Sequence, residues 1–99
     1  MPDPRIHPIT AVDDTFVTVL AVSTLVRAVN TSRAELDLVN DSDESIYLSR
    51  GAAAVLNSGM RLNANGGAYH MGPENIYYGA FYAICAGGDA NLCVSEGSV

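Results

Sequence analysis

The sequence predicts an all-β protein: a single small antiparallel β-sandwich or jelly-roll-like barrel of about eight strands, with an extended N-terminal arm. Two observations favour this fold class. Apolar and polar residues alternate through residues 34–49, and turn-forming residues separate short apolar runs at intervals of about 8–12 positions. No convincing helical period follows residue 30. A chain of 99 residues forms one domain, so we expect an arm at 1–12 and a β-sandwich domain at 13–99.

The first strands are expected in the β-branched segments Thr15–Val22 and Leu25–Asn30. A helix is the rival interpretation for Val17–Val29, because its apolar residues could also share one helical face. The valine and threonine content favours strands, since β-branched side chains fit a pleated surface better than a helix.

Two β-hairpins are expected in the remainder of the chain. The first joins Ala34–Asn40 to Ile46–Ser49 through an Asn-Asp-Ser-Asp turn. The second joins Ala80–Ala86 to Asn91–Ser95 through a Gly-Gly-Asp turn. Short strands at 60–63 and 68–71 are expected between the two hairpins.

The arm contains three prolines, Pro2, Pro4 and Pro8, which fix φ and remove amide donors. Helix and central strand are therefore both poor choices for residues 1–12. The arm is either loose or laid in extended form against a neighbour, with apolar side chains available for that contact at Ile6, Ile9 and Val12.

Composition limits the classes of partner. Apolar residues make up 48% of the chain and charged residues only 16%, below the usual share of roughly a quarter. So few charges favour a surface partly covered by other subunits. The net charge is −6 and the five basic residues are scattered arginines, which argues against nucleic acid and against an anionic membrane surface. No apolar stretch is long enough to span a bilayer, and the N-terminus lacks the pattern of a signal peptide.

Searching for catalytic or metal chemistry gives only weak candidates. The cluster Asn40-Asp41-Ser42-Asp43-Glu44 offers oxygen ligands of the kind that Ca²⁺ favours, but without the spacing of an EF-hand loop, and a solvated turn is the simpler interpretation. His70 lacks the neighbours of a zinc site and is read as an ordinary strand residue. We therefore expect no metal, no cofactor and no catalytic residues, and a non-enzymatic protein.

Cys85 and Cys93 face each other if the last hairpin forms with Ile84 opposite Val94. A cross-strand disulfide is then possible after release into oxidising surroundings. The alternative, which we favour, is a pair of reduced, semi-buried thiols, because assembly in a reducing cytosol does not form disulfides.

A resemblance to a known family rests on a series of turns and core positions. They are Arg33, Val39-Asn40-Asp41-Ser42-Asp43, Ile46-Tyr47-Leu48-Ser49, Gly51, Ser58-Gly59-Met60-Arg61-Leu62, Gly66-Gly67-Ala68-Tyr69, Tyr78-Gly79-Ala80-Phe81-Tyr82-Ala83-Ile84-Cys85-Ala86 and Leu92-Cys93-Val94-Ser95-Glu96-Gly97. Over about residues 25–97 the chain resembles the small β-sandwich modules of tailed-bacteriophage virion proteins, of the capsid decoration (cement) or head-fibre type. Such modules have no catalytic residues to carry over. The resemblance implies a structural virion component.

The expected contact residues come from two places, the arm and an aromatic cluster at 77–82. Tyrosine is favoured at interfaces because it combines an apolar ring with a polar tip. The alternative is that Phe81 or Tyr82 fills the core while Tyr77 and Tyr78 border a loop. The candidate interface residues are Pro4, Ile6, Pro8, Ile9, Tyr77, Tyr78 and Phe81.

The function implied is that of a capsid decoration subunit, which stabilises a phage head by bridging coat subunits. We expect the major capsid protein or other virion proteins as partners and a homo-oligomer, with a trimer favoured. The expected location is the capsid surface of the virion, after assembly in the host cytoplasm. A fibre, tail or carbohydrate-binding adhesion module is the alternative, and an enzyme with an unrecognised pocket is a third hypothesis.

Overall fold

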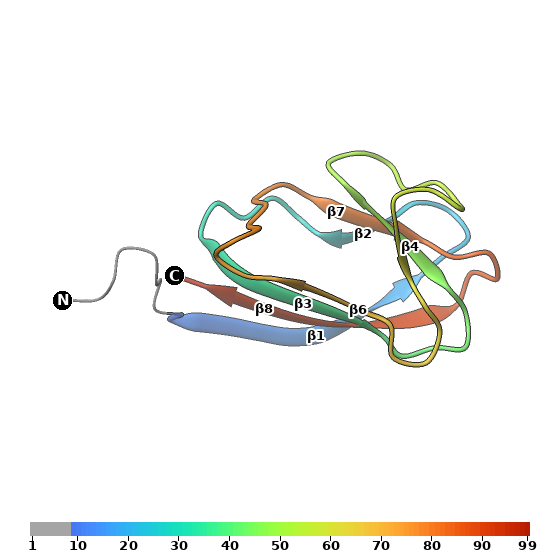
Figure 1. Cartoon of the computed structure of the whole chain (residues 1–99), viewed down its shortest axis with the longest axis horizontal. Helices are drawn as coiled ribbons and strands as arrows, with labels where there is room; N and C mark the ends of the chain where they lie inside the picture. The colour runs from blue at the N-terminus through green and yellow to red at the C-terminus, as the bar shows by residue number, and fades with distance from the viewer. Residues whose placement is uncertain (1–8) are drawn as a thin grey trace.

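A computed structural model describes residues 9–99 and shows two four-stranded antiparallel sheets packed against each other (Figure 1). Sheet A contains, in spatial order, β1 (Ala11–Val19), β8 (Ala90–Ser98), β3 (Arg33–Asn40) and β6 (Ala68–Met71). Sheet B contains β2 (Thr24–Arg27), β7 (Phe81–Ile84), β4 (Ile46–Arg50) and β5 (Met60–Leu62). The predicted fold class is confirmed, and strands replace the rival helix in the 17–29 segment.

The strands are paired in a nested order. The first strand pairs with the last, β2 with β7, β3 with β6, and β4 with β5, each pair antiparallel. The chain therefore folds as one long hairpin rolled into two layers, which is the arrangement of an eight-stranded jelly roll.

Neither predicted hairpin forms, and this is a correction. β3 and β4 lie in different sheets, and so do β7 and β8. In the part of the chain that the structure describes, every connection except β4–β5 crosses from one sheet to the other. Alternation identifies which face of a strand is buried, but it does not identify the neighbouring strand, so a turn between two alternating segments fits an arch between sheets equally well.

The boundary between arm and domain also differs from the prediction. β1 begins at Ala11, inside the expected arm, and the Thr10 amide donates to the Ser98 carbonyl at 2.8 Å. The strand includes Asp13 and Asp14, which precede the expected first strand at Thr15–Val22. Both carboxylates have partners, because Arg27 binds Asp13 at 3.0 Å and the Ser95 hydroxyl donates to Asp14 at 2.5 Å.

Alternate residues of the central strands form the core between the sheets. Leu36 and Leu38 from sheet A meet Ile46, Leu48 and Phe81 from sheet B, and all five side chains are fully buried. Burial of each such side chain contributes about 1.5–3 kcal/mol relative to exposure, so this layer is the main source of stability.

One end of the sandwich is closed by a buried ion pair. Arg33 of β3 is 2% exposed, and its Nε donates to Glu96 of β8 at 2.6 Å. The remaining guanidinium donors bind three backbone carbonyls, those of Ala28, Tyr77 and Gly79, at 2.8–3.0 Å. The Arg33 side chain therefore holds the β2–β3 connection and the segment before β7 onto sheet A.

The other end is closed by a neutral side chain. Asn40, at the end of β3, is fully buried. Its amide nitrogen donates to the carbonyls of Glu44 and Leu62 at 2.6 and 3.1 Å, and its oxygen accepts from the Ser42 hydroxyl at 2.7 Å. Asn40 thus fixes the arch that leads from β3 to β4.

Replacing Glu96 by glutamine should lower the free energy of unfolding by about 3 kcal/mol, because it leaves the buried Arg33 cation without a counter-charge. Urea denaturation measures the effect. The matched control is Glu74→Gln on an exposed loop, which should change stability by less than about 0.5 kcal/mol. Equal effects of the two substitutions would contradict a stabilising role for the pair.

Stability should also fall in acid because of the same group. Burial acts to raise the pKa of Glu96, but the hydrogen bonds and charges of Arg33 and Arg27 outweigh it and lower the pKa below its ordinary value of 4.5. A carboxyl with a depressed folded-state pKa contributes stability above its unfolded pKa and loses it as the pH falls through the folded value. Denaturation measured from pH 7 downward should show a decline that begins near 4.5, and the decline should be shallower in Glu96→Gln.

Candidate interaction surface

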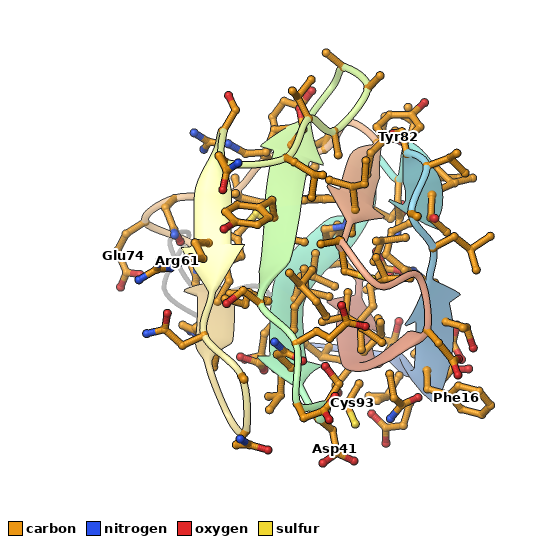
Figure 2. The ribbon with its side chains drawn as sticks, turned by 90° about the vertical axis from the view of Figure 1, so that its right-hand side faces the viewer. Phe16, Asp41, Arg61, Glu74, Tyr82 and Cys93 are labelled. Carbon is orange, nitrogen blue, oxygen red and sulfur yellow. The ribbon has the colours of Figure 1, made fainter. Side chains whose placement is uncertain are left out.

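The predicted aromatic cluster does not form one surface. Phe81 is fully buried, and the Tyr77 ring packs edge-on against it with centroids 5.6 Å apart. Tyr78 is 45% exposed, whereas Tyr82 lies on the outer face of sheet B beside Ser49 (Figure 2). Phe81 is therefore corrected from a contact residue to a core residue, which was the alternative interpretation of the cluster.

Of the arm residues proposed as contacts, Pro4, Ile6 and Pro8 lie outside the described residues. Ile9 is described and is 41% exposed. Its side chain lies over Gly97 of β8, where an added Cβ would come within 2.9 Å of the Ile9 Cδ1. The Ile9 side chain therefore packs partly against β8 of its own chain, and the glycine at position 97 leaves room for it.

The two cysteines lie in different sheets, so the predicted facing pair is wrong. Both are free thiols. Cys85 is fully buried after β7, with its sulfur 3.3 Å from the Val19 carbonyl oxygen, while Cys93 of β8 is half-buried on the outer face of sheet A. The predicted pairing of the two cysteines depended on a hairpin between residues 80–86 and 91–95, and that hairpin does not form.

The acidic turn after β3 uses its polar groups within the protein. Ser42 bonds the buried Asn40, and the Glu44 carboxylate accepts the Gly87 amide at 2.5 Å. Within residues 9–99, no group of three or more histidine, cysteine, aspartate or glutamate side chains is placed to hold a metal ion.

His70 of β6 is exposed and interacts with Asp37 of β3, the residue directly opposite, at 2.5 Å. The hydrogen bond to Asp37 and its charge raise the pKa of His70 above its ordinary value. The pair lies on the outer face of sheet A. The other cross-strand neighbour of Asp37 there is Ser95, whose hydroxyl binds Asp14.

The outer face of sheet A carries two parallel rows that the sequence analysis missed. Because Leu92 and Val94 of β8 point into the core, Cys93 and Ser95 point outward. Cross-strand partners then define an apolar row, which consists of Phe16, Cys93, Val39 and Ala68. The adjacent row is polar and consists of Asp14, Ser95, Asp37 and His70.

A shallow groove of ≈ 690 Å³ runs between these rows, with Phe16, Val39 and Cys93 among its lining residues. Its walls are mainly apolar, and the carboxylate of Asp14 is already bound by Ser95. The groove therefore offers apolar contact area rather than a set of converging reactive groups.

The apolar row ends at β1, which is an edge strand of sheet A. Phe16 is 64% exposed and projects away from the sandwich at this edge (Figure 2). Val12 on the same strand is 62% exposed, and Val22 just beyond it 64%. Phe16 thus extends the apolar row to the edge of the sheet, and exposed apolar surface of this kind is typical of protein contact surfaces.

The alternation of Val12, Asp14, Phe16 and Thr18 was the signal for this surface. It was missed because the first strand was expected to start only at Thr15, which left Val12 and Asp14 outside it. The described residues contain no helix of the length and apolarity that crossing a membrane requires. No family model, curated protein or solved structure matches the chain, so the surface must be interpreted from its own residues.

Proposed function

We propose that this chain is a non-enzymatic structural subunit that binds the outside of a phage capsid as a decoration protein. The observation that carries the proposal is the apolar row across the outer face of sheet A. Cys93 and Val39 are half-buried and Phe16 and Ala68 exposed in the isolated chain, so a flat protein partner could cover all four at once.

Two further features support this function. The jelly roll is an architecture that recurs in viral capsid proteins, although it also recurs in lectins and enzymes and so does not fix the function. The low share of charged residues, 16%, is typical of a protein whose surface is partly covered in an assembly.

The mechanism would be mechanical. Each copy would lie across a junction between copies of the major capsid protein and bury apolar surface on them, at about 25 cal/mol per Å² before the cost of association. Many modest contacts, repeated over a symmetric shell, would resist outward pressure. The chain would be made in the host cytoplasm and end on the virion surface.

The alternative of a carbohydrate-binding module depended on several exposed tyrosines. Tyr77 packs against the buried Phe81, and Tyr78 and Tyr82 do not share a face with it. A stacking platform for sugars is therefore not favoured by the described residues.

The substitution Ala68→Arg should abolish capsid binding, because it places a long charged side chain in the apolar row, on the strand farthest from β1. Purified chain would be added to heads of the encoding phage assembled without it, and co-sedimentation measured. We expect the unaltered chain and the control Val55→Arg, at an exposed position between β4 and β5, to pellet with the heads. Failure of the unaltered chain to pellet, or equal binding by Ala68→Arg, would contradict the proposal.

A further inference from the structure

β1 forms one edge of sheet A, and no strand among residues 9–99 pairs with its outer side. This edge lacks the features that usually keep edge strands from pairing. β1 is nine residues long, contains no proline or lysine, and pairs with β8 in an unbroken register from Ala11 to Val19. Natural edge strands are commonly short, bulged or guarded by prolines and charges. The charges present, Asp13 and Asp14, are held by Arg27 and Ser95 of the same chain.

The backbone groups that face this open edge can be identified. The Asp41 amide donates to the Asn91 carbonyl, so the peptide groups of Asn91 point toward β3. Because the peptide groups of successive residues in a strand point to opposite sides, those of Leu92 point toward β1, where Leu92 pairs with Val17. The peptide groups of Asp14, Phe16 and Thr18 consequently point away from β8, toward the open side.

The side chains on the outer face of β1, together with Leu20 just past its end, form a palindrome of polarity. The peptide groups of Leu20 itself are bonded inside the chain, to Thr24 and Cys85. Val12, Asp14, Phe16, Thr18 and Leu20 read apolar, polar, apolar, polar, apolar around Phe16. Val12 and Phe16 are more than 60% exposed and Leu20 is 44% exposed. Such a sequence is complementary to itself when a second copy runs antiparallel to it.

We propose that β1 binds β1 of a second copy of this chain, antiparallel and centred on Phe16, to form a two-fold symmetric dimer. In this register Phe16 lies opposite the partner's Phe16, and Asp14 opposite the partner's Thr18. Carboxylate meets hydroxyl twice, and the two phenyl rings meet at the centre. The Val12 side chain comes near the partner's Leu20, just past the end of its β1.

Other registers lack this complementarity. Centring on Asp14 places two carboxylates directly opposite each other, which destabilises an antiparallel pair. Centring on Thr15 places Asp14 opposite the partner's Phe16. The Phe16 register also joins the apolar rows of the two copies into one continuous strip across both outer faces, from one Ala68 to the other.

A contact of this kind uses the same patch on both copies and closes at two, so it gives a dimer rather than the trimer favoured by the sequence analysis. The inference does not rest on the proposed function, because it concerns the edge of sheet A and its test contains no capsid.

Sedimentation velocity of the full chain at micromolar concentrations tests the proposal. We expect a dimer for the unaltered chain and for Val55→Lys, and a monomer for Phe16→Lys, which places two ammonium groups opposite each other. Circular dichroism would confirm that Phe16→Lys is folded, as the exposure of Phe16 leads us to expect. A monomeric unaltered chain, or a dimer that persists in Phe16→Lys, would overturn the proposal. A dimer that is lost on deletion of residues 1–8 would also overturn the proposal. That result would mean that the arm of the second copy, and not its β1, binds the edge.

The register is tested separately at Thr18. Thr18→Arg places a cation beside the partner's Asp14 at two symmetric positions, and should tighten the dimer by ~2- to 30-fold in a salt-dependent way. Thr18→Asp should weaken it by a similar factor. Equal dissociation constants for the two variants would rule out the register centred on Phe16.

Discussion

The whole arrangement depends on one buried cation. Arg33 is almost fully enclosed at one end of the sandwich, where its side chain reaches from sheet A to the segment before β7. Its enclosure is tolerated because Glu96 supplies the opposite charge and because three carbonyl groups complete its hydrogen bonds. The guanidinium also lies 5.3 Å from the centre of the Phe81 ring, so the same side chain links the polar end to the apolar core. If the two sheets separated at this end, five donors would have to find water together, which makes partial opening costly.

Fold class and most strand positions could be predicted from the sequence, whereas strand partners could not. Leu36, Leu38, Ile46 and Leu48 alternate with polar residues, and each is buried as that alternation indicates. The same alternation is satisfied by a hairpin and by an arch between sheets. What favours the arch at residues 40–46 is Asn40, whose buried amide binds the carbonyl of Glu44 within the connection and that of Leu62 in β5 of the other sheet. A buried asparagine in a run of turn-forming residues has no sequence signature that separates it from a solvated one.

The candidate surface was only partly accessible to sequence reasoning for a related reason. Aromatic residues at 77–82 were natural candidates for contacts, yet the position of Phe81 opposite Arg27 in sheet B turns its ring into the core. Phe16 was not among the predicted contact residues, and two aspartates, Asp13 and Asp14, stand shortly before it in the sequence. Their partners, Arg27 and Ser95, come from distant parts of the chain, and only the folded structure brings them to β1. Long-range pairing thus converts an apparently wet segment into a regular edge strand.

The nested order of the strands has a consequence for how the chain is made. β8 lies between β1 and β3, so it must insert between two strands that are synthesised long before it. Until then sheet A has a gap at its centre, and Leu36, Leu38 and Val19 lack the strand that packs beside them. A topology with so many distant pairings folds slowly, and its unfinished forms expose strand edges that can associate wrongly. During synthesis, β1 and β3 therefore stay exposed to chaperones and to other nascent chains until β8 has been made and inserted.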